Sequence, residues 1–307
     1  PMSHPFRLLL VTLALLGTVA SAQPIPPRTL AELQAEIERL LQEAGTPGVS
    51  VALVSHNRIE WVTGVGVTDL ASKRPATAQT LFRIGSISKE FVALAALKLQ
   101  EEGKLKLTDP VRAWLPECPI ENPWEATDPV RLVHLLEHTS GVPNGRGISW
   151  AHNDPKPVTM AEALALEPGN RHVRWRPGSR SSYSNYGATL AAAVIEKVSG
   201  QRFEDYVRDN LFGPLGMKRA SYFFTPDADR ASNYRRGVPE PLPYWHTSYR
   251  PAGGISASAE DMANYLLFHL QRGRFGGRQI VAEESMNRLE RPGTLPAVLA
   301  GITTGYG

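Results

Sequence analysis

Apolar residues at helical spacing open the interpretable part of this chain. Segment 29–32 reads Thr-Leu-Ala-Glu, a capping box in which the two end side chains satisfy free backbone N–H groups. The apolar positions that follow, up to Gly45, are Leu33, Ile37, Leu40 and Leu41. This spacing predicts a helix with one apolar face. In stretches 48–55 and 59–67, the side chains follow the two-residue alternation of a β-strand and many are β-branched. This pattern predicts a hairpin of two antiparallel strands packed on that helix.

A second helical pattern is almost entirely apolar. It begins at Ser86, runs toward Gly103 and carries Phe91, Val92, Ala95, Leu97 and Leu99. A helix that is apolar on nearly every side is buried, so we expect it at the centre of the fold. Further helices are predicted over the ranges 128–138, 186–198, 203–211 and 260–272.

Together these elements predict an α+β fold with two lobes. The hairpin and its flanking helices indicate an antiparallel sheet, and an all-helical lobe of about 109–209 is expected between sheet segments. The chain contains no internal repeat and no long low-complexity tract. We therefore interpret 23–307 as one domain.

The first residues are typical of a secretory signal. Arg7 is followed by an apolar run over 8–20 and by the small residues Ala20-Ser21-Ala22. The run is too short to span a bilayer and has the length of a signal-peptide core. We predict a signal peptide over 2–22, with cleavage before Gln23. An uncleaved amphipathic anchor is the alternative.

Composition and cysteine content limit the remaining possibilities. The chain is 42% hydrophobic and 21% charged, with a formal net charge of +3 and basic residues spread along it. This indicates an ordinary globular protein and no nucleic-acid partner. Cys118 is the single cysteine, so no internal disulfide can form and no cysteine near the cleavage site can receive a lipid. We expect a periplasmic or secreted protein without a stable membrane anchor.

The strongest chemical signal is Ser86-Ile87-Ser88-Lys89, where an extended run, 80–85, meets the apolar helix. Residues three apart share one helix face, so Ser86 and Lys89 can point into the same cleft. Free N–H groups at a helix start favour negative charge on a serine that loses its proton. Burial lowers the pKa of a lysine, which makes Lys89 a candidate base. A capping serine beside a solvated lysine is the alternative.

A second motif, Tyr183-Ser184-Asn185, follows a turn-rich stretch and precedes a predicted helix. Three framing segments occur in the same order as in a known group of enzymes: 135–141, 212–217 and 251–261. With these pieces, the chain resembles the serine β-lactamase and penicillin-binding-protein superfamily. Specifically, it resembles the class C-like branch of β-lactamases, D-alanyl-D-alanine carboxypeptidases and esterases. The resemblance covers about 30–306 and implies the β-lactamase/transpeptidase-like fold.

The resemblance implies a serine hydrolase that forms a covalent ester on Ser86 and uses no cofactor or metal. Lys89 or Tyr183 takes the Ser86 proton, and both remain candidates because the pair titrates as one coupled unit. Asn185 is expected to bind the substrate amide or to orient Lys89. The Ser86 backbone N–H is one expected oxyanion donor. An ester, a β-lactam and a D-amino-acid peptide remain open as the small-molecule or peptidoglycan-derived substrate.

One motif of the family has no match in this chain. Family members carry Lys-Thr-Gly or His-x-Gly on a late strand, and neither sequence occurs here. The Arg-Pro-Gly segments at 176–178 and 291–293 are turns, because proline cannot serve a central strand. We interpret the chain as C-terminally incomplete, ending at Gly305-Tyr306-Gly307 near the start of that strand. The second oxyanion donor would then be absent, which leaves the activity of this chain open.

Two other functions remain as alternatives. His134, Glu137 and His138 match H-x-x-E-H, which is typical of a zinc hydrolase, although the His-Thr-Ser-Gly turn of the family explains the same residues. The other alternative is a non-catalytic protein that recognises penicillin or peptidoglycan. Four loop aromatic residues are candidates for an apolar acyl pocket: Trp150, Trp175, Tyr244 and Trp245.

Overall fold

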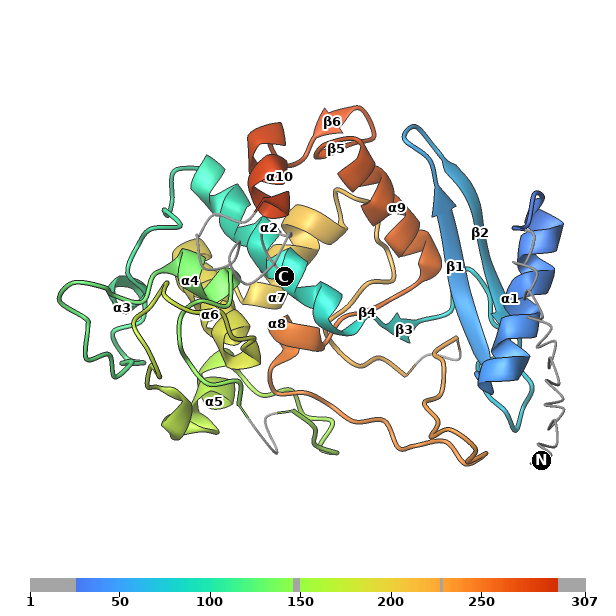
Figure 1. Cartoon of the computed structure of the whole chain (residues 1–307), viewed down its shortest axis with the longest axis horizontal. Helices are drawn as coiled ribbons and strands as arrows, with labels where there is room; N and C mark the ends of the chain where they lie inside the picture. The colour runs from blue at the N-terminus through green and yellow to red at the C-terminus, as the bar shows by residue number, and fades with distance from the viewer. Residues whose placement is uncertain (1–25, 146–149, 227–228, 292–307) are drawn as a thin grey trace, which may run out of the picture.

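The computed structural model describes residues 26–145, 150–226 and 229–291. Helices and small antiparallel sheets alternate along this part of the chain (Figure 1), which confirms the predicted α+β class. The predicted signal peptide, 2–22, lies outside the described residues, as does the segment from 292 to 307 on which the interpretation of the C-terminus rests.

The predicted hairpin is confirmed. β1 (Gly48–Val54) pairs in antiparallel register with β2 (Ile59–Gly66). α1 (Leu30–Ala44) begins after its capping residue Thr29 and lies along the outer side of the hairpin (Figure 1). α9 (Ala259–Leu270) covers the side that faces the rest of the molecule. The hairpin is therefore the middle layer between two helices.

The helix at the centre of the molecule is α2 (Ser88–Glu101), as its apolar sequence predicts. Every side chain from Phe91 to Leu97 is buried. α6 (Asn185–Ser199), α8 (Arg250–Gly253) and α10 (Glu283–Glu290) all pack against it. Since α2 is packed on several sides, residues at its start are held on a rigid base.

A short ladder joins two distant segments just before α2. β3 (Phe82–Arg83) lies antiparallel to β4 (Ser256–Ala257), with Phe82 opposite Ala257. Because α8 immediately precedes β4 in the chain, this pairing brings α8 against the turn that leads from β3 into α2. The active-site candidates lie at this junction.

The helix predicted over 128–138 is wrong at its start. In the structure α4 spans only Leu132–Leu136. Arg131 is extended and forms an antiparallel bridge with Pro110, a contact between segments far apart in the sequence. The proline at position 129 locally favours a first helical turn here, but the tertiary bridge holds Arg131 in an extended conformation.

The other predicted helices are found with small changes. The helix predicted over 203–211 begins as α7 (Phe203–Val207) and continues as a π-helical segment, Arg208–Phe212. The remaining elements are α3 (Val111–Trp114), α5 (Met160–Ala165), a 3-10 turn at Pro168–Asn170, β5 (Arg274–Phe275) and β6 (Arg278–Gln279). Within the described ranges, no helix has both the length and the apolar sequence needed to cross a bilayer.

Candidate active site

A tight turn places Ser86 at the start of the central helix. Gly85 has a φ of 58°, in the left-handed region that favours glycine, and Ser86 follows in a 3-10 turn, Gly85–Ile87. Ser88 closes the turn, because its hydroxyl donates to Gly85 O at 2.7 Å and accepts from Ile255 N at 3.2 Å. Ser86 itself is exposed. Its hydroxyl is therefore accessible on a well-fixed backbone.

Lys89 lies one helical turn further on and points back to Ser86. Its Nζ is 3.1 Å from Ser86 Oγ and 2.6 Å from the carbonyl oxygen of Ala252 on α8. The residue is only 3% exposed. Burial lowers the pKa of Lys89 from its usual 10.5 to about 7, because the ammonium loses hydration that its two neutral partners replace only in part.

Tyr183 approaches the same hydroxyl from the start of α6. Its OH is 2.6 Å from Ser86 Oγ, and Lys89 Nζ lies 4.6 Å from the centre of its ring. Burial raises the pKa of Tyr183 above its usual 10, while the hydrogen bond with Ser86 acts in the opposite direction. At neutral pH the phenol is therefore protonated. The structure thus brings together the three residues that the sequence proposed as catalytic.

His138 is a neighbour of this cluster that the sequence analysis assigned only to a structural turn or to zinc. Its ring lies tilted against the Tyr183 ring with centroids 4.4 Å apart, and its Nδ1 accepts from Ser184 N at 3.2 Å. Burial, and then the charge of Lys89, lower the pKa of His138 to about 4. His138 is consequently neutral at pH 7, and its ring packs against the ring of Tyr183.

Asn185 occupies the first position of α6. Its Nδ2 donates to Asn144 Oδ1 at 2.6 Å, and its backbone N–H donates to the same oxygen at 2.8 Å. The Asn185 Oδ1 atom is buried and has no hydrogen-bond partner among the described residues. Asn144, which sequence reasoning missed, therefore orients this amide, and within the described chain no hydrogen bond joins Asn185 to Lys89.

The side chains of the three proposed zinc ligands do not meet at one site. His134 Nδ1 accepts from Arg131 N at 3.2 Å, whereas Glu137 pairs with Arg288 at 2.6 Å. His138 faces Tyr183 instead. In the part of the chain that the structure describes, no group of three His, Cys, Asp or Glu side chains is arranged to hold a metal ion.

Each of the four aromatic residues proposed for an acyl pocket contacts another side chain of the protein. Arg83 lies 4.8 Å from the ring centre of Tyr244 and 3.9 Å from that of Trp245. Arg174 lies 4.4 Å from the ring centre of Trp175. Trp150 meets Tyr249 edge to face, with centroids 6.5 Å apart. The Arg83 contacts place Tyr244 and Trp245 beside β3, close in the chain to Ser86.

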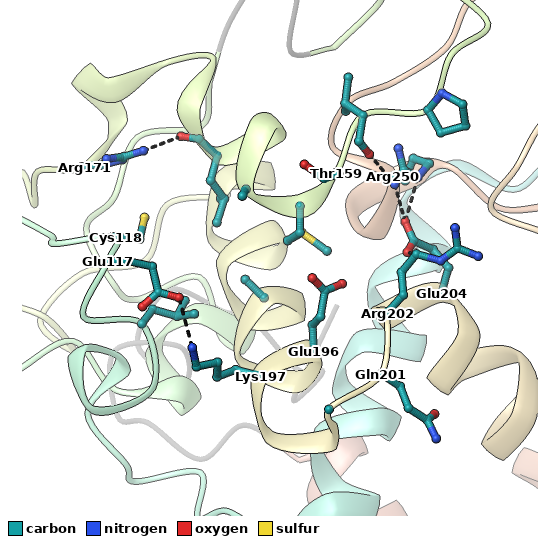
Figure 2. A pocket seen from close by; sticks show the side chains of 18 residues that line it. Glu117, Cys118, Thr159, Arg171, Glu196, Lys197, Gln201, Arg202, Glu204 and Arg250 are labelled. Carbon is teal, nitrogen blue, oxygen red and sulfur yellow. Dashed lines mark hydrogen bonds and ion pairs between the residues drawn. The ribbon is translucent and has the colours of Figure 1, made fainter.

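A cavity of about 690 Å³ lies elsewhere, between α5, α6 and α8 (Figure 2). Ser86, Lys89 and Tyr183 are not among the residues that line it. Its wall contains a buried ion pair in which Arg250 and Glu204 approach to 2.7 Å. Arg202, also on the wall, is exposed.

A family of known sequences matches most of this chain. Residues 33–307 match a family described as Beta-lactamase. Penicillin-binding protein 4* of Bacillus subtilis (strain 168) is 32% identical over 160 residues, covering 52% of this chain and 34% of the relative. A Beta-lactamase of Escherichia coli (strain K12) is 28% identical over 263 residues, covering 84% of this chain and 66% of the relative. This chain thus spans about one third to two thirds of the length of these two proteins.

Solved structures with the same fold cover most of this chain. The octameric penicillin-binding protein homologue from Pyrococcus abyssi aligns with a TM-score of 0.71 and 31% identity, covering 85% of this chain and 59% of that one. EstCE1, described as a hydrolase with promiscuous acyltransferase activity, aligns with a TM-score of 0.70 and 22% identity. That alignment covers 85% of this chain and 76% of EstCE1. The second match concerns the fold alone.

Proposed function

This chain belongs to the beta-lactamase family, and on that premise we propose that it is a serine hydrolase that transfers an acyl group to Ser86 and then to water. One observation carries the proposal. The exposed Ser86 hydroxyl lies within hydrogen-bond distance of both the Lys89 amine and the Tyr183 phenol. A nucleophile, a buried amine and a second proton carrier in contact are the parts that acyl transfer requires.

In the proposed reaction, Lys89 is the first proton acceptor. With a pKa of about 7, Lys89 is neutral in a substantial fraction of the protein molecules at pH 7, whereas an ordinary lysine is neutral in roughly one molecule in a few thousand. The raised pKa of Tyr183 makes a phenolate scarce at that pH. The lowered pKa of Lys89 and the raised pKa of Tyr183 favour Lys89 over Tyr183 as the base that activates Ser86.

The proton and bond changes balance without a further reactant. Ser86 Oγ attacks the substrate carbonyl while its proton passes to Lys89, and the leaving group departs with a proton relayed through Tyr183. Water then attacks the Ser86 ester and gives up a proton to the same pair. The ester bond breaks, Ser86 regains its hydroxyl proton, and a carboxylic acid is released.

The substrate class is proposed only as a carbonyl compound of three kinds: an ester, a β-lactam or a D-amino-acid peptide. The names of the relatives include a Beta-lactamase and a penicillin-binding protein, which favours β-lactam or peptidoglycan-like substrates. We also propose export to the periplasm or medium, on the basis of the predicted signal peptide, 2–22.

Replacing Ser86 with alanine tests the function. A fluorescent phosphonate should label the wild-type protein and not Ser86→Ala, and hydrolysis of p-nitrophenyl acetate or nitrocefin should fall by at least roughly a thousandfold. The fold should persist because Ser86 is exposed. Ser72→Ala, at an exposed serine on the loop after β2, is the matched control.

Two results would contradict the proposal in different ways. Labelling and turnover that survive Ser86→Ala would show that another residue is the nucleophile. A folded full-length protein that the probe does not label, but that binds a penicillin reversibly, would favour the non-catalytic recognition protein.

A further inference from the structure

We propose that Arg250 and Glu204 are positioning residues, which hold the Ala252 carbonyl on α8 against Lys89 and so keep the Lys89 amine on Ser86. Neither residue touches Ser86 or lies in the two sequence motifs. The inference deepens the proposed function and rests on it for its kinetic consequence, but the arrangement itself can be tested without turnover.

The first step is the contact between α8 and the catalytic cluster. Lys89 Nζ has its shortest hydrogen bond, 2.6 Å, to Ala252 O. The same helix lies against the turn that carries Ser86, because a Cβ on Gly253 would come within 3.8 Å of the Gly85 carbonyl. The position of α8 therefore sets the direction of the Lys89 amine and supports the nucleophile turn at the same time.

The second step is that α8 cannot hold this position alone. It spans only Arg250–Gly253, and so short a helix has almost no intrinsic stability. Its backbone is fixed by tertiary contacts. It packs against α2, α6 and the Gly85–Ile87 turn.

The third step is the anchor at the first residue of α8. Arg250 Nε donates to Glu204 Oε1 at 2.7 Å, and Arg250 Nη2 donates to Val158 O at 2.8 Å. The Arg250 and Glu204 side chains are 10% and 2% exposed. The Arg250 guanidinium also lies 5.0 Å from the ring centre of Phe223. One side chain thus ties α8 to α7, to the segment before α5 and to the Phe223 loop.

A buried pair of this kind fits a positioning role better than a stabilising one. The cost of removing two charges from water largely cancels their attraction, so such pairs add little net stability. The planar guanidinium, however, fixes direction as well as distance. Catalysis depends on that precision, because a displacement of about 1 Å at a reacting group can lower the rate a hundredfold.

The cavity makes a chemical-rescue experiment possible. Figure 2 shows Arg250 and Glu204 joined at the wall of the cavity of about 690 Å³, so truncation of Arg250 would leave a gap open to that space. In Arg250→Ala we expect kcat to fall by about 10- to 100-fold with KM changed less than about threefold. Guanidinium at about 20 mM, far below denaturing concentrations, should restore part of kcat, and equal concentrations of urea or sodium chloride should not.

A second readout follows Lys89 directly. Trinitrobenzenesulfonate labels neutral amines, and peptide mapping gives the pH midpoint for Lys89, which faces Tyr183 and His138 as titratable neighbours. Loosening α8 admits water, which stabilises the ammonium. We therefore expect this midpoint to move toward the ordinary lysine range in Arg250→Ala and to return with guanidinium.

The matched control is Arg202→Ala. Arg202 lines the same cavity and lies 3.9 Å from Glu204 Oε2, but it is exposed and belongs to a different segment. It should leave kcat and the Lys89 midpoint unchanged. If Arg250→Ala does not fold, Arg250→Lys tests the positioning role instead. This variant keeps a cation opposite Glu204 but loses the planar geometry of the guanidinium. An intermediate fall in kcat and an intermediate midpoint shift are expected.

The outcomes separate the two proposals. Wild-type kinetics and an unchanged Lys89 midpoint in a folded Arg250 variant would overturn the positioning role. A shifted Lys89 midpoint in a protein that shows no Ser86-dependent turnover would support the anchor and contradict the proposed function.

Discussion

At the scale of single residues, burial changes the pKa values of the two proposed proton carriers in opposite directions. Lys89 and Tyr183 both lose water, but the charged form is the protonated one in lysine and the deprotonated one in tyrosine. Burial therefore lowers the pKa of Lys89 and raises that of Tyr183. The same physical cause leaves part of the amine neutral and keeps the phenol protonated at neutral pH, as their proposed roles as base and proton donor require.

Lys89→Met should stabilise the protein in a pH-dependent way. The folded-state pKa of about 7 lies below the ordinary value of 10.5, so between these pH values the unfolded chain binds a proton that the folded chain lacks. Wild-type stability consequently rises with pH across this window. Below pH 7, the folded protein carries the full free-energy cost of burying the Lys89 ammonium. The variant should be more stable by on the order of 4 kcal/mol near pH 6, with the difference shrinking toward pH 10.

Urea unfolding at a series of pH values measures this difference. Lys104→Met is the control, because the exposed Lys104 keeps its ammonium in water. A Lys89→Met advantage that grows with pH would contradict the assignment of Lys89 as a desolvated amine.

At the scale of elements, helix starts place the candidate catalytic groups. α2 holds Lys89 one turn from Ser86, and α6 presents Tyr183 just before its capping residue, Ser184. The Ser184 hydroxyl accepts from Gly187 N at 2.9 Å and donates to Pro143 O at 2.7 Å. A single cap thus fastens both the helix and the loop that carries Asn144.

Ser184→Ala should cost about 1–2 kcal/mol of unfolding free energy, because both hydrogen bonds of a buried hydroxyl are lost. It should also lower kcat roughly tenfold, since Tyr183 is the adjacent residue. Urea unfolding and steady-state kinetics measure the two effects. Ser199→Ala, at the other end of α6, is the control and should change stability by less than about 0.5 kcal/mol. Equal effects of the two substitutions would argue against the cap.

At the scale of the whole molecule, protection from solvent is uneven. α2 and α6 are buried along most of their length, whereas α1 has no buried residue although it packs along the hairpin (Figure 1). The candidate catalytic cluster lies at the starts of these buried helices. Opening of the outer layer should therefore leave the active site intact.

Hydrogen exchange followed by mass spectrometry tests this difference. Amides of α1 should exchange many times faster than those of α2, because little buried apolar area is lost when α1 opens. Peptides from α6 serve as the internal reference for the slow class. Protection of α1 equal to that of α2 would contradict the layered view.

Local sequence patterns determined most of the elements of this protein. The capped helix, the hairpin and the buried α2 follow from periodicity over a few residues, which depends on backbone geometry alone. The start of α4 did not follow, because the bridge between Pro110 and Arg131 joins segments that no local window contains.

At the candidate active site, too, some features followed from local sequence and others only from the tertiary structure. The spacing of Ser86 and Lys89 was readable because both lie on one helix turn, and the resemblance of motifs pointed to Tyr183. Only the tertiary structure placed Tyr183 OH 2.6 Å from Ser86 Oγ, and only it supplied the Ala252 carbonyl and the His138 ring. The apolar helix pattern already indicated that burial lowers the pKa of Lys89, but the value of about 7 depends on the tertiary packing. Desolvation depends on everything packed around a group, and that packing comes from segments distant in sequence.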